Sequence, residues 1–255
     1  MGFFYFYPMD VRQYLDSTYL KTAEQADLSE DDNSSVVKSY IEEAIKEQFK
    51  LIMIRPEYVS MAKKMIEESS SALAVGTVID FPNGTSSIDD KLNQAQQAIN
   101  SGADELDFVC NYQAFIDGNI GLVKNEILKG TALGLENFKV VKWIIETAAL
   151  NPQQIVQISA LIKNVVLTNF KESQMNSVFV KSSTGFYKTE DGRPNGATIP
   201  NIILMLENAA PLPVKAAGGV RNYNEAIEMI NLGVKRIGTS AAKAIADGKM
   251  SDSHY

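Results

Sequence analysis

Two lysines that end apolar runs are the side chains of this chain most able to do chemistry. Lys181 follows Val178-Phe179-Val180, Lys215 follows Pro213-Val214, and small residues with glycine come after each lysine. An ammonium group at such a place loses contact with water, and this loss lowers the pKa of a lysine. A second lysine nearby would lower the pKa further, because like charges repel. A neutral amine attacks carbonyl groups, so the two sites predict Schiff-base chemistry.

Three further charged residues lie within apolar runs and extend this pattern. Asp16 follows Tyr14-Leu15, Asp107 lies between Leu106 and Phe108, and Lys142 follows Val140-Val141. A single charge of this kind is most often half of a structural ion pair. Burying five charges costs several kcal/mol for each one that stays unpaired, whereas Leu and Val would fill the same core without that cost. The five together therefore predict one paired network.

Glycine-bearing loops follow the last three apolar runs and predict a phosphate site. The residues concerned are Gly185, Gly218, Gly219, Gly238 and Ser240. Glycine allows backbone N–H groups to approach an anion closely, and loops of this kind next to a helix N-terminus hold phosphate in α/β barrels. The chain contains neither a dinucleotide-binding fingerprint nor a Walker A sequence.

The elements that must position these residues alternate between strand and helix. Short β-rich runs separated by amphipathic helical patterns are typical of βαβ units and a parallel sheet. Strands are expected near residues 14–16, 51–54, 72–79, 105–110, 140–145, 177–181, 213–216 and 235–238, with helices such as 36–47, 58–68, 88–101 and 222–232 between them.

Eight such units in a chain of 255 residues without a linker predict one TIM (β/α)8 barrel domain. A doubly wound open sheet is the alternative. Residues 1–10 are expected to form an aromatic N-terminal extension that serves as a plug or contact surface, and residues 247–255 a mobile C-terminal tail. The acidic run Glu30-Asp31-Asp32 is expected to be a solvated approach to the helix that begins at Val36.

Composition narrows the class of protein. The chain is 45% hydrophobic and carries a net charge of -7, which argues against a nucleic-acid or anionic membrane surface. Its one cysteine, Cys110, excludes an intrachain disulfide and favours a reducing compartment, so we expect a cytoplasmic protein. No apolar run reaches the roughly 18 residues of a membrane span. With one histidine and one cysteine the chain has few of the usual zinc ligands, and no metal is expected.

Several motifs resemble those of the deoxyribose-phosphate aldolase family, and the resemblance runs over nearly the whole chain. The motifs are Leu15-Asp16-Ser17-Thr18, Arg55-Pro56-Glu57-Tyr58-Val59, Gly102-Ala103-Asp104-Glu105-Leu106-Asp107, Lys142-Trp143-Ile144-Ile145-Glu146-Thr147, Lys181-Ser182-Ser183-Thr184-Gly185-Phe186, Lys215-Ala216-Ala217-Gly218-Gly219-Val220-Arg221 and Arg236-Ile237-Gly238-Thr239-Ser240. The resemblance implies a class I aldolase that needs no cofactor. It would interconvert 2-deoxyribose 5-phosphate with acetaldehyde and glyceraldehyde 3-phosphate in deoxyribonucleotide catabolism, and would form a homodimer.

The resemblance also implies a role for each candidate residue. Lys181 would form the Schiff base, Lys215 would depress its pKa, and Asp107 would relay protons with Lys215 through a water molecule. Asp16 and Lys142 would support this network. Gly185, Gly218, Gly219, Gly238 and Ser240 would hold the substrate phosphate. Tyr255, at the end of the tail, would assist proton transfer, and an untethered chain end is the alternative for that residue.

Two positions depart from some members of the family. Met53 stands where some relatives carry a reactive cysteine, and Phe186 stands where some carry a lysine that could help to hold phosphate. Cys110 has the opposite strand parity to Asp107, so its thiol should point away from the barrel interior. Two other functions remain open, namely another Schiff-base sugar-phosphate aldolase or transaldolase, and a non-catalytic sugar-phosphate binding protein.

Overall fold

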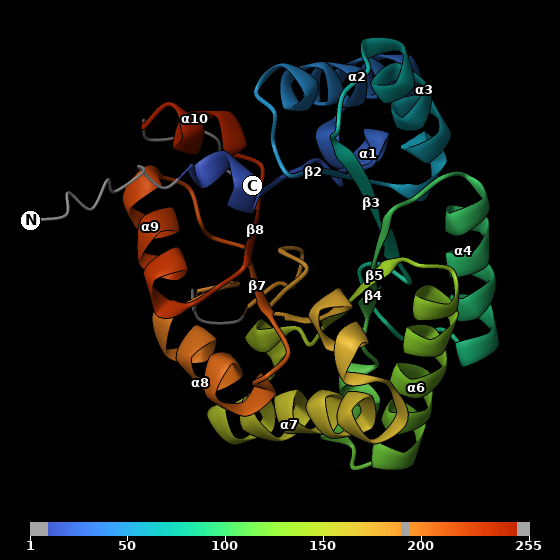
Figure 1. The fold of residues 1–255 in the computed structure, drawn as a ribbon, viewed down its shortest axis with the longest axis vertical. Helices are drawn as coiled ribbons and strands as arrows, with labels where there is room; N and C mark the ends of the chain where they lie inside the picture. The colour runs from blue at the N-terminus through green and yellow to red at the C-terminus, as the bar shows by residue number, and fades with distance from the viewer. Residues whose placement is uncertain (1–9, 190–193, 249–255) are drawn as a thin grey trace, which may run out of the picture.

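Eight parallel strands pair in chain order and close into a barrel in the computed structural model, which describes residues 10–189 and 194–248 (Figure 1). The strands are β1 (Leu15–Thr18), β2 (Leu51–Ile54), β3 (Ala74–Ile79), β4 (Glu105–Val109), β5 (Val140–Ile144), β6 (Val178–Lys181), β7 (Val214–Ala217) and β8 (Arg236–Thr239). Because Asp16 on β1 pairs in register with Gly238 on β8, the sheet has no edge. The predicted TIM barrel is confirmed, and the open doubly wound alternative is wrong.

Every predicted strand is present, with each end within two residues of its expected place. The helices pack around the barrel (Figure 1). They are α1 (Ala23–Ala26), α2 (Glu30–Lys46), α3 (Val59–Ser69), α4 (Ile88–Asn100), α5 (Tyr112–Ile116), α6 (Ile120–Glu136), α7 (Pro152–Asn169), α8 (Ile199–Ala209), α9 (Tyr223–Leu232) and α10 (Ala242–Ala246). None of the helices in the described part of the chain is long and apolar enough to cross a membrane.

The acidic run after Ser29 was expected to precede a helix, and this expectation is wrong. Helix α2 begins at Glu30, and the side chain of Ser29 caps it by accepting a hydrogen bond from the N–H of Asp32. Three acidic residues in the first turn are stabilised by the positive end of the helix dipole. The predicted extension (residues 1–10) and tail (247–255) lie almost wholly outside the described residues and stay predictions.

Alternation along the strands divides the barrel into an outer and an inner core. Outward residues such as Phe108 and Trp143 stack on each other with ring centroids 4.9 Å apart, and the indole N–H of Trp143 donates to Thr131 on α6. Inside the barrel, Leu51 and Met53 of β2 and Val78 of β3 form a small apolar cluster with Leu20, which follows β1. Buried charged residues come from the other six strands. The interior therefore has an apolar side and a charged side.

Close packing of α6 against the sheet depends on Gly130. A Cβ at this residue would lie 2.8 Å from the Trp143 ring, whereas a Cβ at Gly121 on the same helix would have no neighbour within 4 Å. We expect Gly130→Ala to lower the free energy of unfolding by about 1–3 kcal/mol through overpacking. Gly121→Ala should raise it by up to about 1 kcal/mol through helix propensity. Urea denaturation of both variants checks this, and equal effects would contradict the packing.

Candidate active site

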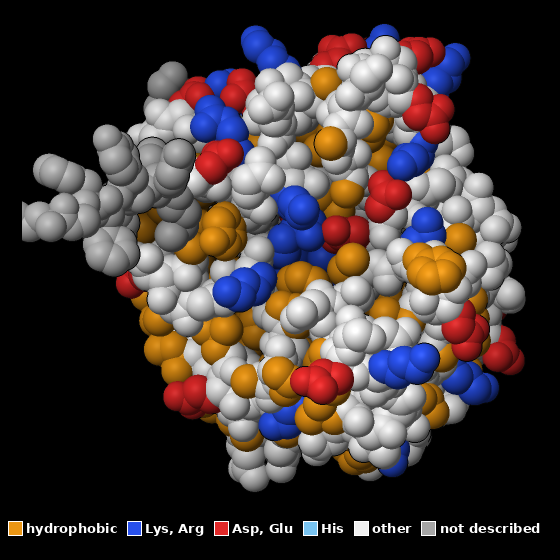
Figure 2. All heavy atoms as spheres, viewed as in Figure 1, with side chains coloured by type: hydrophobic (Ala, Val, Ile, Leu, Met, Phe, Trp, Pro, Cys, Tyr) orange, Lys and Arg blue, Asp and Glu red, His pale blue; other side chains and the backbone are white. Residues whose placement is uncertain are grey.

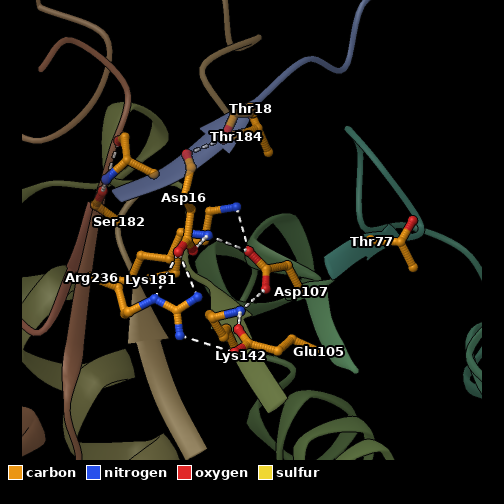
Figure 3. Close-up of polar contacts among 12 residues, drawn as sticks. Asp16, Thr18, Thr77, Glu105, Asp107, Lys142, Lys181, Ser182, Thr184 and Arg236 are labelled. Carbon is orange, nitrogen blue, oxygen red and sulfur yellow. Dashed lines mark hydrogen bonds and ion pairs between the residues drawn. The ribbon is translucent and has the colours of Figure 1, made fainter. Parts of the chain in front are cut away.

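Asp107 on β4 is the point at which three lysines meet (Figure 3). Its Oδ1 accepts a hydrogen bond from Nζ of Lys142 at 2.7 Å. Its Oδ2 accepts from Nζ of Lys181 at 2.8 Å and from Nζ of Lys215 at 3.0 Å. The carboxylate is fully buried. Strand register brings these side chains together, because Asp107 pairs with Lys142 across β4 and β5, and Lys181 pairs with Lys215 across β6 and β7.

The ion pairs continue around the barrel until they close on themselves. Asp16 pairs with Nζ of Lys215 at 2.6 Å through Oδ2 and with Nη2 of Arg236 at 2.5 Å through Oδ1. Glu105 pairs with Nη1 of Arg236 at 2.9 Å through Oε1 and with Nζ of Lys142 at 2.5 Å through Oε2. We call this closed set of alternating charges the charge ring; its members are Asp107, Lys142, Glu105, Arg236, Asp16 and Lys215. The predicted network of five charges is therefore present, and it includes two residues that were not predicted.

Lys181 stands outside this ring and contacts it only through Asp107. The ring holds three carboxylates and three cations, so it is neutral by itself. Each ring cation contacts two carboxylates, whereas Lys181 shares one carboxylate with two other lysines. With Lys181 included, the cluster has four cations and three carboxylates, and Lys181 is the cation that contacts one carboxylate where the others contact two.

The pKa values follow this balance. Burial, assisted by the charge of Lys215, lowers the pKa of Lys181 to about 8, although Asp107 acts in the opposite direction. Burial also penalises the charge of Lys142, but Asp107 and Glu105 outweigh it and raise the pKa of Lys142. The three lysines likewise overcome burial at Asp107 and hold its pKa well below the ordinary value. At pH 7 about a tenth of Lys181 is therefore neutral, against about 4 in 10,000 for an ordinary lysine.

One pocket joins Lys181 to all five residues predicted to hold phosphate. It has an empty volume of about 800 Å³, including the space open to solvent, and its lining contains Gly185, Gly218, Gly219, Gly238 and Ser240. Gly218 has a φ of 85°, and a Cβ there would lie 3.0 Å from the Cα of Gly196. A side chain at this position would therefore crowd the loop. Basic side chains gather in the middle of the barrel face in the space-filling view (Figure 2).

The sequence patterns missed four residues of this site. Glu105 and Arg236 close the charge ring, while Thr184 and Arg221 line the pocket. Strand alternation could have found the first two, since Glu105 lies two residues before Asp107 and Arg236 two residues before Gly238. Arg221 adds a basic residue to the lining of the pocket that the glycine pattern did not reveal.

A buried carboxylate after β5 fixes the loop between Lys181 and Gly185. Glu146 is 1% exposed, and its Oε2 accepts hydrogen bonds from the N–H and the hydroxyl of Thr184. The hydroxyl oxygen of Thr184 accepts in turn from the N–H of Phe186. Burial raises the pKa of Glu146 in spite of these hydrogen bonds. The loop that separates the two ends of the pocket is thus held from the neighbouring strand.

Phe186 closes the apolar side of the pocket. Its ring meets that of Phe81 edge to face with centroids 5.0 Å apart, and the guanidinium of Arg55 lies 5.4 Å from the centre of the Phe81 ring. Phe186 also packs against the inner apolar cluster that contains Met53. Tyr255 lies outside the described residues, so its predicted role in proton transfer stays a prediction.

Comparisons with known proteins agree on one family. A model of the DeoC/LacD family of aldolases matches residues 18–245. The chain is 35% identical over 240 residues to a deoxyribose-phosphate aldolase of Caldicellulosiruptor saccharolyticus, covering 92% of this chain and 96% of the relative. It is 34% identical over 248 residues to a deoxyribose-phosphate aldolase of Streptococcus pneumoniae, covering 97% of this chain and 100% of the relative. The solved structure of an aldolase named QR15 is similar with a TM-score of 0.76 at 30% identity, covering 94% of this chain and 95% of that chain.

The position of Cys110 predicts resistance to unsaturated aldehydes. The thiol is fully buried in the outer core, and burial together with Glu126 raises its pKa well above the ordinary value, so the reactive thiolate is scarce. We expect crotonaldehyde to leave Cys110 unmodified in the folded protein and to modify it in urea, as mass spectrometry of the intact chain would report. Rapid inactivation with an adduct on Cys110 would contradict this.

Proposed function

The chain belongs to the DeoC/LacD family of aldolases, and from this premise we propose that it cleaves 2-deoxy-D-ribose 5-phosphate reversibly into acetaldehyde and D-glyceraldehyde 3-phosphate. The reaction would proceed through a Schiff base on Lys181. The observation that carries the proposal is a single uncompensated lysine at one end of a pocket whose other end consists of glycine loops. Such a pocket suits a molecule with a carbonyl at one end and a phosphate at the other.

The phosphate end would be held by the backbone and by few side chains. The chain has a net charge of -7, so a general basic field does not attract the anion. Gly185, Gly218 and Gly219 have positive φ angles that L side chains rarely adopt, and their N–H groups can approach an anion closely. Ser240 and Arg221 also line the pocket and could add a hydroxyl and a guanidinium to this end. Phe186 stands where some relatives carry a lysine, and Arg221 could supply the positive charge that Phe186 lacks.

The carbonyl end would react with the neutral amine of Lys181. In the cleavage direction the Nζ attacks C1 of the open-chain sugar, and a proton moves from nitrogen to oxygen in the carbinolamine. A second proton, delivered to the hydroxyl from Lys215 through water, then lets the hydroxyl leave as water and gives an iminium ion. Asp107 accepts a hydrogen bond from the amine of Lys181, and Lys215 donates to the same carboxylate oxygen of Asp107. Both residues are therefore placed to exchange these protons through a water molecule. The iminium carries the same unit charge as the lysine ammonium, so Asp107 can stabilise both.

The iminium then accepts the electron pair of the C2–C3 bond. The C3 hydroxyl loses its proton, C3 becomes the aldehyde carbon of glyceraldehyde 3-phosphate, and C2 remains as an enamine on Lys181. Protonation of C2, for which Tyr255 is a candidate donor, restores an iminium. Water hydrolyses this iminium to acetaldehyde and the free amine. No external cofactor is required, because the lysine itself provides the electron sink.

Location and assembly are parts of the same proposal. A cytoplasmic location is supported by the single cysteine. A homodimer is supported by the aromatic residues at the N-terminus, which lie outside the described part of the chain. Deoxyribonucleotide catabolism is the route that would deliver the substrate.

Product formation and covalent trapping test the proposed reaction together. A coupled assay should detect glyceraldehyde 3-phosphate from deoxyribose 5-phosphate, and borohydride with acetaldehyde should reduce a two-carbon adduct onto Lys181. Lys181→Met should remove the adduct and lower kcat by several orders of magnitude, because no other amine faces the pocket in the described residues. Lys243→Met, an exposed lysine outside the pocket, should change neither. Turnover without an adduct on Lys181 would overturn the mechanism.

The rate of trapping should depend on pH in a defined direction. Neutral Lys181 is the reacting form, and its pKa is lowered to about 8, so the rate should rise with pH and reach half its maximum near pH 8. Lys215→Leu removes one positive charge beside Lys181 and should move this midpoint upward, so that the rate at pH 7 falls. Single-turnover trapping with acetaldehyde between pH 6 and 10 measures both midpoints. An unchanged midpoint in Lys215→Leu would contradict the electrostatic role of Lys215.

A further inference from the structure

Glu105 and Arg236 face each other on the side of the charge ring that does not touch Lys181. Arg236 is 5% exposed, and its Nη1 lies 2.9 Å from Oε1 of Glu105. Neither residue contacts Lys181, and neither lines the pocket that Lys181 shares with the glycine loops. A role in binding substrate therefore does not account for their buried charges.

The buried charges of Glu105 and Arg236 are explained by the charge balance of the ring. Arg236 contacts Oδ1 of Asp16, and Lys215 contacts Oδ2 of the same carboxylate. Glu105 contacts Lys142, which also holds Asp107. Through these links the pair completes the balance of three positive and three negative charges. The cluster with Lys181 included then carries one excess positive charge.

We propose that Glu105 and Arg236 are positioning residues that influence the protonation of Lys181 without touching it. They do so because their charges hold the net charge of the cluster, Lys181 included, at +1. The proposal rests on Lys181 being the reacting amine. Removing Glu105 raises the excess to two and favours loss of the Lys181 proton. Removing Arg236 lowers the excess to zero and favours its retention. The two halves of one ion pair thus act on the same amine in opposite directions.

The charged groups that the barrel strands place around Lys181 all belong to this cluster, whereas Arg221, which lines the same pocket, and Glu146 lie on loops. The groups on the strands come from β1 (Asp16), β4 (Glu105 and Asp107), β5 (Lys142), β7 (Lys215) and β8 (Arg236). The interior side formed by β2 and β3 is apolar and offers no compensating charge, with Leu51, Met53 and Val78 buried there. Glu146, on the loop after β5, is the further carboxylate near Lys181, and it is hydrogen-bonded to Thr184.

The expected size of the effect is measurable. At an effective dielectric constant of about 20, a unit charge about 10 Å away shifts a pKa by about one unit. The ring is buried, so salt in the buffer screens it only weakly. At a fixed pH below the midpoint, a shift of one unit changes the rate of imine formation about tenfold.

The experiment measures the pH midpoint of borohydride trapping with acetaldehyde in Glu105→Gln, in Arg236→Gln and in the double variant. Both substitutions keep hydrogen-bonding groups while removing a charge. We expect the midpoint to fall by about one unit in Glu105→Gln, to rise by about one unit in Arg236→Gln, and to return near the wild-type value in the double variant. If Glu105 and Arg236 only maintain the fold, both single variants lose trapping amplitude or move in the same direction, and the proposal is overturned.

Controls separate the remaining outcomes. Lys91 and Glu126 form another buried ion pair at 2.6 Å outside the ring, so Glu126→Gln should leave the midpoint unchanged. Circular dichroism reports whether each variant is folded. If a single variant does not fold, Asp16→Asn and Lys142→Gln make the same changes of charge within the ring and must shift the midpoint down and up, respectively. Absence of trapping in the wild type would refute the proposed function, whereas wild-type trapping with unmoved midpoints in the variants would refute only this inference.

Discussion

The structure depends on a ring of three carboxylates and three cations that leaves the charge of one further lysine unbalanced. Buried charges are costly, and a core of Leu and Val would give a more stable barrel, so the ring is not explained by stability. Its effect is selective, since each ring cation is held by two carboxylates while Lys181 shares one. Lys181, whose pKa is lowered, is also the lysine that faces the pocket. The geometry distinguishes Lys181 from Lys142 and Lys215 without reference to any relative.

The barrel makes this arrangement possible because its interior is assembled from strands far apart in the sequence. Asp16 near the start of the chain and Arg236 near its end become neighbours only when β1 pairs with β8. The same strand ends carry the loops that line the phosphate end of the pocket. Gly185 lies four residues after Lys181, the last residue of β6, on a loop that Glu146 holds through Thr184. The two ends of the substrate pocket are therefore fixed relative to each other by one short, buried segment.

Sequence reasoning predicted the fold and most of the site because both depend on local pattern. Buried parallel strands read as apolar runs, and a lysine or aspartate within such a run is conspicuous. Glu105 and Arg236 were missed because each lies at the beginning of its strand, where a charge is normally exposed. The strand alternation that turns Asp107 and Gly238 inward also turns Glu105 and Arg236 inward, and the ion pair between them shows this in the closed barrel. The start of α2 was misplaced because its first turn is polar and its cap, Ser29, is recognised by hydrogen bonding and not by hydrophobic period.

Lys181 is the fourth cation beside three carboxylates, and its pKa is lowered to about 8. The most direct measurement is an NMR titration of the lysine side chains in the protein labelled with carbon-13 at Cε, with Lys181→Met used to assign the resonance. The charge balance of the cluster predicts that one resonance titrates near pH 8, that it disappears in Lys181→Met, and that Lys142 does not titrate in that range. A Lys181 resonance that titrates above pH 10, or a different lysine that titrates near pH 8, would contradict it.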